Sequence, residues 1–227
     1  MKRRAVPLTG QDTARLPTPC NQCLCWELGA ACPQPGTSGL VGTDQPVEAA
    51  AKKQQWVSQQ VQAGHPPGRL LVVDDEVVAY ALFGPGEIFA RRQPLVPVVS
   101  DDALLLATVW VDPVHREQGF GRLLLQAAIK EAIRLELASV QSYGDRRWRQ
   151  RACALPATWL LHEGFEVHSE HPRTPLFEIE TRRTARWAES FEHAVEEVLG
   201  TLPRAAPRPA PRPAVNTEGL RTQANKR

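Results

Sequence analysis

The stretch from residue 103 to residue 137 constrains the fold most strongly, because a buried strand, a charged glycine loop and a helix follow one another there. The run ALLLATVWV, residues 103–111, is bounded by Asp and Pro and is too short for a fully buried helix, which predicts a strand covered on both faces. The run RLLLQAAIKEAIRLEL, residues 122–137, has apolar residues at helical spacing, which predicts an amphipathic helix. A strand that leads directly into a helix indicates an α/β fold.

Further elements are expected on both sides of this unit. Before it, the expected elements are a short strand over 23–28, a helix over 46–63 that Asp44 can cap, and a hairpin over 69–83. After it, they are a strand over 139–143, a helix over 154–165 that ends at Gly164, a hairpin over 166–180, and a last helix carrying Trp187, Phe191, Ala194 and Val198.

The uneven distribution of 20 prolines suggests where the folded domain begins and ends. Residues 1–19 are polar and unpatterned, and residues 201–227 contain almost no large apolar side chain. Segments without apolar surface to bury cannot offset the entropy lost on ordering. We therefore expect a disordered segment over 1–19, one globular domain over 20–200, and a disordered Pro/Arg-rich tail over 201–227. A weak contact between this tail and an acidic partner is the alternative to a solvated tail.

Charge and hydropathy exclude several classes of protein. A net charge of +2 argues against a dedicated nucleic-acid binder, whose domain is normally markedly basic. The longest apolar run is about half of what a membrane-spanning helix needs. The start, MKRRAVPLTGQ, has no apolar core behind its basic residues and so does not match a secretory signal. These features predict a cytoplasmic protein with no nucleic-acid or membrane partner.

The loop before the amphipathic helix has the composition of an anion site. Gly119 and Gly121 let consecutive backbone amides converge, and Arg116 and Arg122 add positive charge beside the helix N-terminus. The plainer alternative is a tight, charged surface turn. A dinucleotide-binding fingerprint needs a third glycine where Leu124 stands, and a P-loop needs a longer glycine spacing followed by Lys and Ser/Thr.

The wider segment VDPVHREQGFGR, residues 111–122, resembles the acetyl-CoA motif of the GNAT acetyltransferases. The order of elements over residues 20–180 is similar to that family as well, including a helix that closes on Gly164-Phe165. The N-terminal pattern P-C-x-x-C-x-x-W-E-L resembles an actinobacterial branch of the superfamily. The resemblance implies a mixed, mostly antiparallel central sheet flanked by helices on both faces.

The resemblance also implies how acetyl-CoA would bind as a co-substrate. The backbone amides from Gln118 to Arg122 would hold the pyrophosphate, and the exposed backbone of Val109 and Val111 would pair with the pantetheine arm. An N–H near Val111 would polarise the thioester carbonyl. The implied cofactor-binding residues are Val109, Val111, Arg116, Gln118, Gly119, Phe120, Gly121 and Arg122.

The resemblance does not identify the catalytic residues. The family commonly has a tyrosine that protonates the departing thiolate where this chain has Leu160, and an asparagine where it has Cys153. Tyr143 and His162 are possible substitutes for the proton donor, although packing and solvation are the plainer roles for them. The candidates for the base are Asp101 and Asp102, for which a turn is the plainer role. The candidates for the border of the acceptor site are Arg91, Arg92 and Trp56, for which a solvated face is the plainer role.

The cysteines offer a weaker signal for a metal. Cys20 and Cys23 have the spacing of zinc ligands, and Cys25 and Cys32 follow. Because Cys23 and Cys25 would share one face of a strand, core packing is favoured, and we expect the cysteines to be reduced and metal-free. His162, His168 and His171 do not form an H-E-x-x-H pattern, so no metal is expected there either.

Taken together, the residues and the resemblance predict an N-acetyltransferase that moves an acetyl group from acetyl-CoA to a primary amine by direct attack on the thioester. The acceptor would be a small molecule or a peptide. A non-catalytic acyl-CoA-binding regulatory module is the alternative, because the expected tyrosine is missing. A scaffold that acts through its tail is the third possibility.

Overall fold

The described residues form one sheet with helices on both faces. A computed structural model describes residues 3–30, 46–90, 97–147, 153 and 155–182 of the chain. The strands are β1 (Arg3–Pro7), β2 (Gly68–Val73), β3 (Glu76–Pro85), β4 (Ala103–Val111), β5 (Ser139–Asp145), β6 (Leu155–Pro156), β7 (Glu166–Ser169) and β8 (Leu176–Glu180). The helices are α1 (Pro46–Gln62), α2 (Phe120–Arg134) and α3 (Ala157–His162), with short 3-10 turns η1 (Gly10–Arg15), η2 (Gly86–Ile88) and η3 (Pro113–His115).

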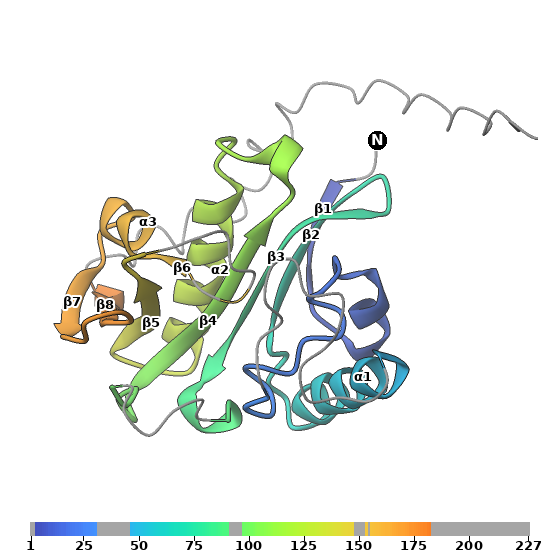
Figure 1. Cartoon of the computed structure of the whole chain (residues 1–227), viewed down its shortest axis with the longest axis horizontal. Coiled ribbons are helices and arrows are strands. Elements are labelled where there is room, and N and C mark those ends of the chain that lie inside the picture. Colours follow the sequence, from blue (N-terminus) through green and yellow to red (C-terminus); the bar gives the residue numbers. More distant parts are fainter. Residues whose placement is uncertain (1–2, 31–45, 91–96, 148–152, 154, 183–227) are drawn as a thin grey trace, which may run out of the picture.

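The strands follow the order β1-β2-β3-β4-β5-β8-β7 across the sheet, and β6 pairs with the end of β5 (Figure 1). Neighbours pair antiparallel except β4 with β5 and β5 with β6, which are parallel. The predicted fold class is confirmed: the sheet is mixed and mostly antiparallel.

Two separate cores lie on opposite faces of this sheet, because alternate residues of a strand point to opposite sides. Leu71 and Val73 of β2 pack in the core that includes the apolar face of α2. Leu70 and Val72 pack in the other core, together with Val57 of α1 and with the N-terminal layer, by which we mean residues 8–30. None of the helices in the described ranges is long and apolar enough to cross a membrane.

Several predicted elements are present with shifted ends. The helix expected over 46–63 is α1, and the hairpin expected over 69–83 is formed by β2 and β3. Asp74 and Asp75 join these strands with φ values of 48° and 65°, as a two-residue turn of the hairpin type requires. The helix expected over 154–165 is shorter: it is α3, which begins at Ala157 because Leu155 and Pro156 form β6, and it ends at His162. Asp44, the last predicted helix and the tail lie outside the described residues.

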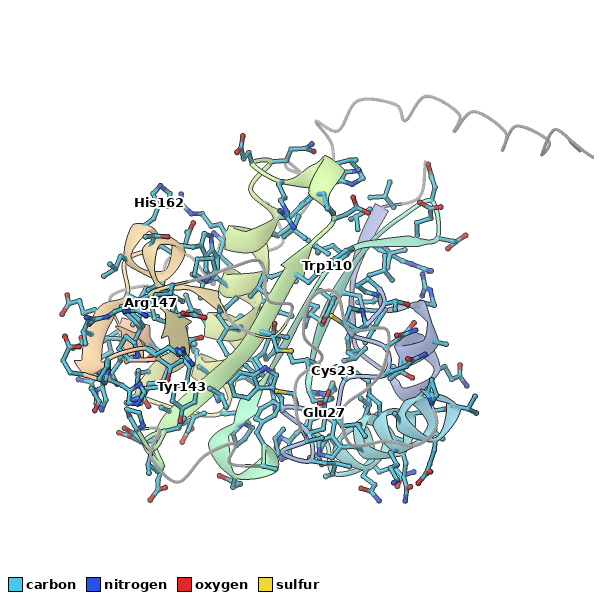
Figure 2. The ribbon with its side chains drawn as sticks, in the orientation of Figure 1. Cys23, Glu27, Trp110, Tyr143, Arg147 and His162 are labelled. Atoms are coloured by element: carbon cyan, nitrogen blue, oxygen red, sulfur yellow. The ribbon has the colours of Figure 1, made fainter. Side chains whose placement is uncertain are left out.

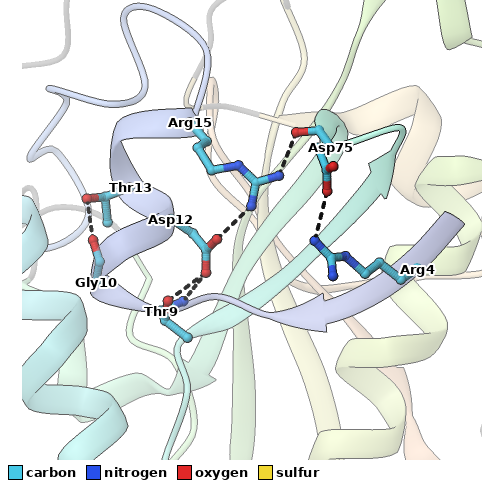
Figure 3. Close-up of polar contacts among 7 residues, drawn as sticks. All are labelled: Arg4, Thr9, Gly10, Asp12, Thr13, Arg15 and Asp75. Atoms are coloured by element: carbon cyan, nitrogen blue, oxygen red, sulfur yellow. Dashed lines mark hydrogen bonds and ion pairs between the residues drawn. The ribbon is translucent and has the colours of Figure 1, made fainter. Parts of the chain in front are cut away.

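The prediction of a disordered segment over 1–19 is wrong from Arg3 onward. β1 extends the sheet by pairing with β2, and charged side chains then attach the following turn to the β2–β3 hairpin (Figure 3). Arg4 forms an ion pair with Asp75 at 3.1 Å, and Arg15 donates to the backbone carbonyl of Asp75 at 2.8 Å. Arg15 also binds Asp12 at 2.9 Å. Polar residues order this segment by binding a turn remote in sequence, which no local pattern reveals.

The strand predicted over 23–28 is absent, because residues 20–30 form turns. A buried lysine of α1 holds these turns in place: Lys53 Nζ donates to the backbone carbonyl of Cys23 at 3.0 Å and pairs with the carboxylate of Glu27. The Lys53 and Glu27 side chains are only 3% and 1% exposed. The N-terminal layer is therefore attached to α1 by a desolvated ion pair.

The cysteines differ in oxidation state within this layer. Cys25 is disulfide-bonded, so the expectation that all cysteines are reduced is wrong at that residue. Cys20, Cys23 and Cys153 are buried thiols. Because residues 20–30 form turns, Cys23 and Cys25 are not fixed on one face of a strand, and their sulfur atoms take different roles. Cys32 lies outside the described residues.

We predict that removing one partner of the buried ion pair destabilises the protein strongly. Lys53→Met leaves the Glu27 carboxylate buried without its cation, and such a change typically costs ~3–5 kcal/mol. Replacing both residues, Lys53→Met with Glu27→Leu, should cost less, since no charge stays buried. Urea unfolding measures both effects.

Lys52→Met is the matched control for this prediction. Lys52 is the neighbouring residue of α1, and its ion pair with Glu48 is exposed. We expect a change within ~0.5 kcal/mol for this variant. Equal losses for the Lys52 and Lys53 variants would contradict the proposed anchoring role.

Candidate acyl-CoA site at the opening between β4 and β5

β4 and β5 part after a short parallel ladder. They pair only at Ala103↔Ser139, Leu104↔Val140 and Leu105↔Gln141 within the described residues, although β4 continues to Val111. At the point of divergence, the Ser142 hydroxyl donates to the carbonyl of Leu106 at 2.7 Å. On its other side, β4 remains paired with β3 through Val111, so the divergence opens one edge of β4 toward β5.

A β-bulge in β4 lies at the same place. Leu82 of β3 pairs with Thr108, but the next residue, Phe83, pairs with Leu106, so Ala107 is an extra residue on β4. Bulges bend a strand and increase its local twist. The bulge thus contributes to directing the second half of β4 away from β5.

The backbone of β4 presents Val109 and Val111 to this opening. The amide of Asp112 donates to the Val78 carbonyl of β3 at 2.9 Å. Because amides alternate between the two edges of a strand, the amide of Trp110 also points to β3, and the amides of Val109 and Val111 point to the opening. These are the two residues predicted from the sequence to pair with an extended ligand.

The loop that follows β4 curls before it enters α2. Glu117 and Gly119 both have positive φ values, 62° and 84°, and Gly119 is the N-cap of the helix. The amide of Leu123 donates to the Gly119 carbonyl at 3.0 Å, so the amides of residues 119–121 precede the helical ladder. Converging amides at a helix N-terminus form a binding site for anions. The loop therefore has the geometry of an anion site, and pyrophosphate binding there stays a prediction.

Glycine occupies the two positions of the loop for different physical reasons. Gly119 adopts a left-handed conformation that costs other residues about 1 kcal/mol or more. Gly121 lies within α2, and a Cβ added there would meet Cζ2 of Trp159 at 3.2 Å. Its missing side chain therefore makes room for the indole of α3. Packing is thus a reason for glycine at residue 121 that the sequence did not indicate, and close approach of both glycines to a ligand stays a prediction.

The polar side chains of the loop also bind the protein itself. Arg116 is exposed, and its Nε donates to the Val111 carbonyl at 3.4 Å. The Gln118 amide nitrogen donates to the Val114 carbonyl at 3.3 Å, while its Oε1 is buried without a partner among the described residues. Arg122 pairs with the buried carboxylate of Glu163 at 2.7 Å. Phe120 is buried in the core, so only its backbone faces the loop.

Neither Leu160, which stands where the family has a tyrosine, nor Tyr143 presents an available proton donor. Leu160 is fully buried in the core on the α2 face. The Tyr143 hydroxyl donates to the Pro97 carbonyl, and its ring stacks on Trp26 with centroids 6.0 Å apart. Cys153 accepts a hydrogen bond from Trp26 Nε1 at its backbone carbonyl, 3.1 Å away, and its thiol lies beside Cys23.

The other candidates from the sequence lie elsewhere. His162 projects outward from α3 and is 74% exposed (Figure 2). Asp101 and Asp102 are exposed at the turn before β4, and Trp56 is buried against Phe89. The other two histidines weighed as metal ligands bind locally, His168 to Glu178 at 3.0 Å and His171 to the Thr174 amide at 3.0 Å. Arg91 and Arg92 lie outside the described residues.

Two features of the site were missed by sequence reasoning. Asp145 ends β5 with a buried side chain, and one of its oxygens accepts from the Arg147 amide at 2.8 Å. Trp26, from the N-terminal layer, contacts both Tyr143 and Cys153 beside the opening. Cys23 and Tyr143, both labelled in Figure 2, pack in the core on the face of the sheet that this layer covers. An acidic strand end and a tryptophan in a turn carry no distinctive pattern in a single sequence.

Comparison with known proteins agrees with this architecture. Residues 40–156 match the model of the acetyltransferase (GNAT) family, and the chain belongs to that family. An N-acetyltransferase from Staphylococcus aureus Mu50 has a similar fold, with 15% identity and a TM-score of 0.52 over 80% of this chain and 99% of that one. A putative acetyltransferase from Salmonella typhimurium, solved with its cofactor acetyl-CoA, has 16% identity and a TM-score of 0.51 over 80% and 95% of the two chains. No curated protein matches the sequence.

We predict that Gly121 and Trp159 are energetically coupled. Gly121→Ala places a methyl group against the indole and should cost ~1–3 kcal/mol, as overpacking does. In a Trp159→Phe background the same substitution should cost less, because the smaller ring leaves space. Thermal unfolding of the single and double variants measures the coupling.

Gly119→Ala provides the control, because its cost comes from a left-handed backbone and not from the indole. That cost should be the same in the natural chain and in the Trp159→Phe background. Additive losses at Gly121 and Trp159 would contradict the packing explanation.

Proposed function

We propose that this chain binds acetyl-CoA between β4 and β5 and transfers the acetyl group to a primary amine. The observation that supports the proposal most directly is the parting of β4 from β5 beside the curled N-terminus of α2. The pantetheine arm would pair with the backbone of Val109 and Val111 as an additional strand. The pyrophosphate would lie on the amides of residues 118–122, close to Arg116 and Arg122.

The residues of this site fit such a ligand. An anion at the loop would face amides that precede the helical ladder, and the helix dipole adds about half a positive charge there. The buried Nδ1 of His115 and Oε1 of Gln118 have no partner among the described residues, so the loop has unused hydrogen-bonding capacity. The acyl-CoA thioester supplies an activated acetyl group, and an amide such as that of Val111 can stabilise charge developing on its carbonyl oxygen.

The proton transfers of this reaction require residues other than the tyrosine and asparagine of the family pattern, because this chain has Leu160 and Cys153 in their places. The departing thiolate resembles a free cysteine, with a pKa of about 8.5, so it can leave without a strong acid. Asp145 is a candidate base, because its carboxylate ends the strand that lines the opening. The acceptor would be a small-molecule or peptide amine, and a cytoplasmic location stays a prediction.

The burial of Leu160 and the occupied hydroxyl of Tyr143 also support a second candidate, a non-catalytic acyl-CoA-binding regulator. One experiment separates the two. Coenzyme A release is measured with acetyl-CoA and a panel of small amines, peptide N-termini and lysine peptides. Acceptor-dependent release supports the enzyme, whereas tight acetyl-CoA binding with no release for any amine supports the regulator.

We predict that Arg116 contributes to acyl-CoA affinity. Charge-assisted hydrogen bonds are worth ~1.5–3 kcal/mol, so Arg116→Ala should weaken acetyl-CoA binding about tenfold or more. Isothermal titration calorimetry measures the change. Arg134→Ala, at the other end of α2, is the control and should leave the affinity unchanged. Equal losses in both variants would indicate a general charge effect and contradict the proposed location.

We predict that the hydroxyl of Tyr143 does not donate the proton to the leaving group, because it is already bonded to Pro97. Tyr143→Phe keeps the ring stacked on Trp26 and should lower kcat less than about tenfold. Loss of a true proton donor typically costs ~10²–10⁴-fold. The kcat and its pH profile decide between these outcomes, and a loss of about a hundredfold with removal of the basic limb would identify Tyr143 as the donor.

A further inference from the structure

The thiols of Cys23 and Cys153 lie in contact although 130 positions separate them in the sequence. Their sulfur atoms are 3.6 Å apart, and the two residues are only 7% and 6% exposed. Cys23 belongs to the N-terminal layer, and Cys153 precedes β6 beside the opening between β4 and β5. The sulfur of Cys25 lies within 4.8 Å of both. Neither the fold nor the proposed acetyl transfer requires two thiols at this place.

A metal site is the first possibility to weigh. Zinc in proteins normally has three or four protein ligands, and cysteine ligands bind as thiolates. The sulfur of Cys25 is committed to a disulfide, which leaves Cys23 and Cys153 as the thiols of this group. Two thiols are fewer than a structural zinc ion needs, so the arrangement favours chemistry between the two sulfur atoms.

That chemistry is disulfide formation. A disulfide has a sulfur–sulfur bond of about 2.05 Å, so the two atoms need to approach by only about 1.5 Å. The contact with the Cys153 thiol, despite burial and with support from the Cys25 backbone, lowers the pKa of Cys23 to about 7. Cys23 is therefore partly thiolate at neutral pH, and the thiolate is the form that reacts with oxidants. Burial of the pair favours an oxidant as small as hydrogen peroxide.

We propose that Cys23 and Cys153 are a peroxide-responsive pair that closes a reversible disulfide. The Cys23 thiolate attacks one oxygen of hydrogen peroxide, which breaks the O–O bond, forms a sulfenic acid and releases hydroxide. The Cys153 thiol then attacks the Cys23 sulfur, the S–S bond forms, and the sulfenic oxygen leaves as water. The two thiols lose two electrons and two protons, and the peroxide is reduced to two molecules of water. A dithiol reductant restores both thiols.

Closure would join two parts of the chain that now touch through non-covalent contacts. Trp26 already binds the Cys153 carbonyl and stacks on Tyr143, so the bridge would form within an existing interface. A crosslink between residues 130 positions apart restricts the unfolded chain strongly. The oxidised protein should therefore be more stable than the reduced one. This change needs neither acetyl-CoA nor an amine, so it is independent of the proposed function.

The test uses the full chain without prior reduction, so that the disulfide of Cys25 is kept. The protein is treated with a small excess of hydrogen peroxide, remaining thiols are alkylated, and tryptic peptides are mapped by mass spectrometry. We expect a linked peptide pair containing Cys23 and Cys153 that disappears with dithiothreitol. We also expect the Tm to rise by about 5 °C or more, as a long crosslinked loop implies.

Variants separate this pair from the other cysteines. Cys23→Ser and Cys153→Ser should each abolish the linked peptide and the rise in Tm, whereas Cys20→Ser, a buried thiol of the same layer, should keep both. The mapping of the wild-type protein stays informative if a variant does not fold. Alkylation of Cys23 and Cys153 as separate peptides after peroxide would overturn the proposal. Stoichiometric zinc that protects both residues from oxidation would overturn it as well and identify a metal site.

Discussion

The parting of β4 and β5 after three residue pairs is the constraint on which the candidate site depends. A continuous ladder between these strands would satisfy the backbone of β4 within the sheet and leave no edge for a ligand. The divergence instead leaves open the edge of β4 to which the amides of Val109 and Val111 point. After this edge the chain enters a curled loop at the N-terminus of α2. The bulge at Ala107 and the hydroxyl of Ser142 mark the place where the two strands separate. One local change in pairing thus brings an open strand edge next to the loop that we propose binds the pyrophosphate.

The N-terminal layer covers the face of the sheet opposite α2 and adjoins the same opening. It is attached by three kinds of interaction: a buried ion pair to α1, a hydrogen bond from Arg15 to the β2–β3 hairpin, and the contacts of Trp26 with Tyr143 and Cys153. Tyr143 belongs to β5, which borders the opening between β4 and β5. Through Trp26 the layer therefore contacts one side of this opening.

Local periodicity was enough to predict most of the sheet and its helices. The apolar run of β4, the paired runs of β2 and β3, and the stripe of α2 each carry a signal within about fifteen residues, as such patterns do. The position of a glycine loop directly before α2 also followed from residue types. The order of residues 3–19 and the turns of residues 20–30 did not, since Arg15, Lys53 and Glu27 act through contacts with partners remote in sequence. For the same reason, no local pattern indicated that Gly121 serves the packing of Trp159 or that Cys153 meets Cys23.

The two ends of the sheet have a consequence for how copies of this protein behave toward each other. The edge strands β1 and β7 are five and four residues long, and exposed edge strands are templates for pairing between molecules. β1 ends with Pro7, which has no amide to donate, and it carries the exposed charge of Arg4. The register of β7 against β8 is interrupted between Val167 and Ser169. Among the described residues, short, charged and irregular edges of this kind disfavour strand-to-strand pairing between molecules.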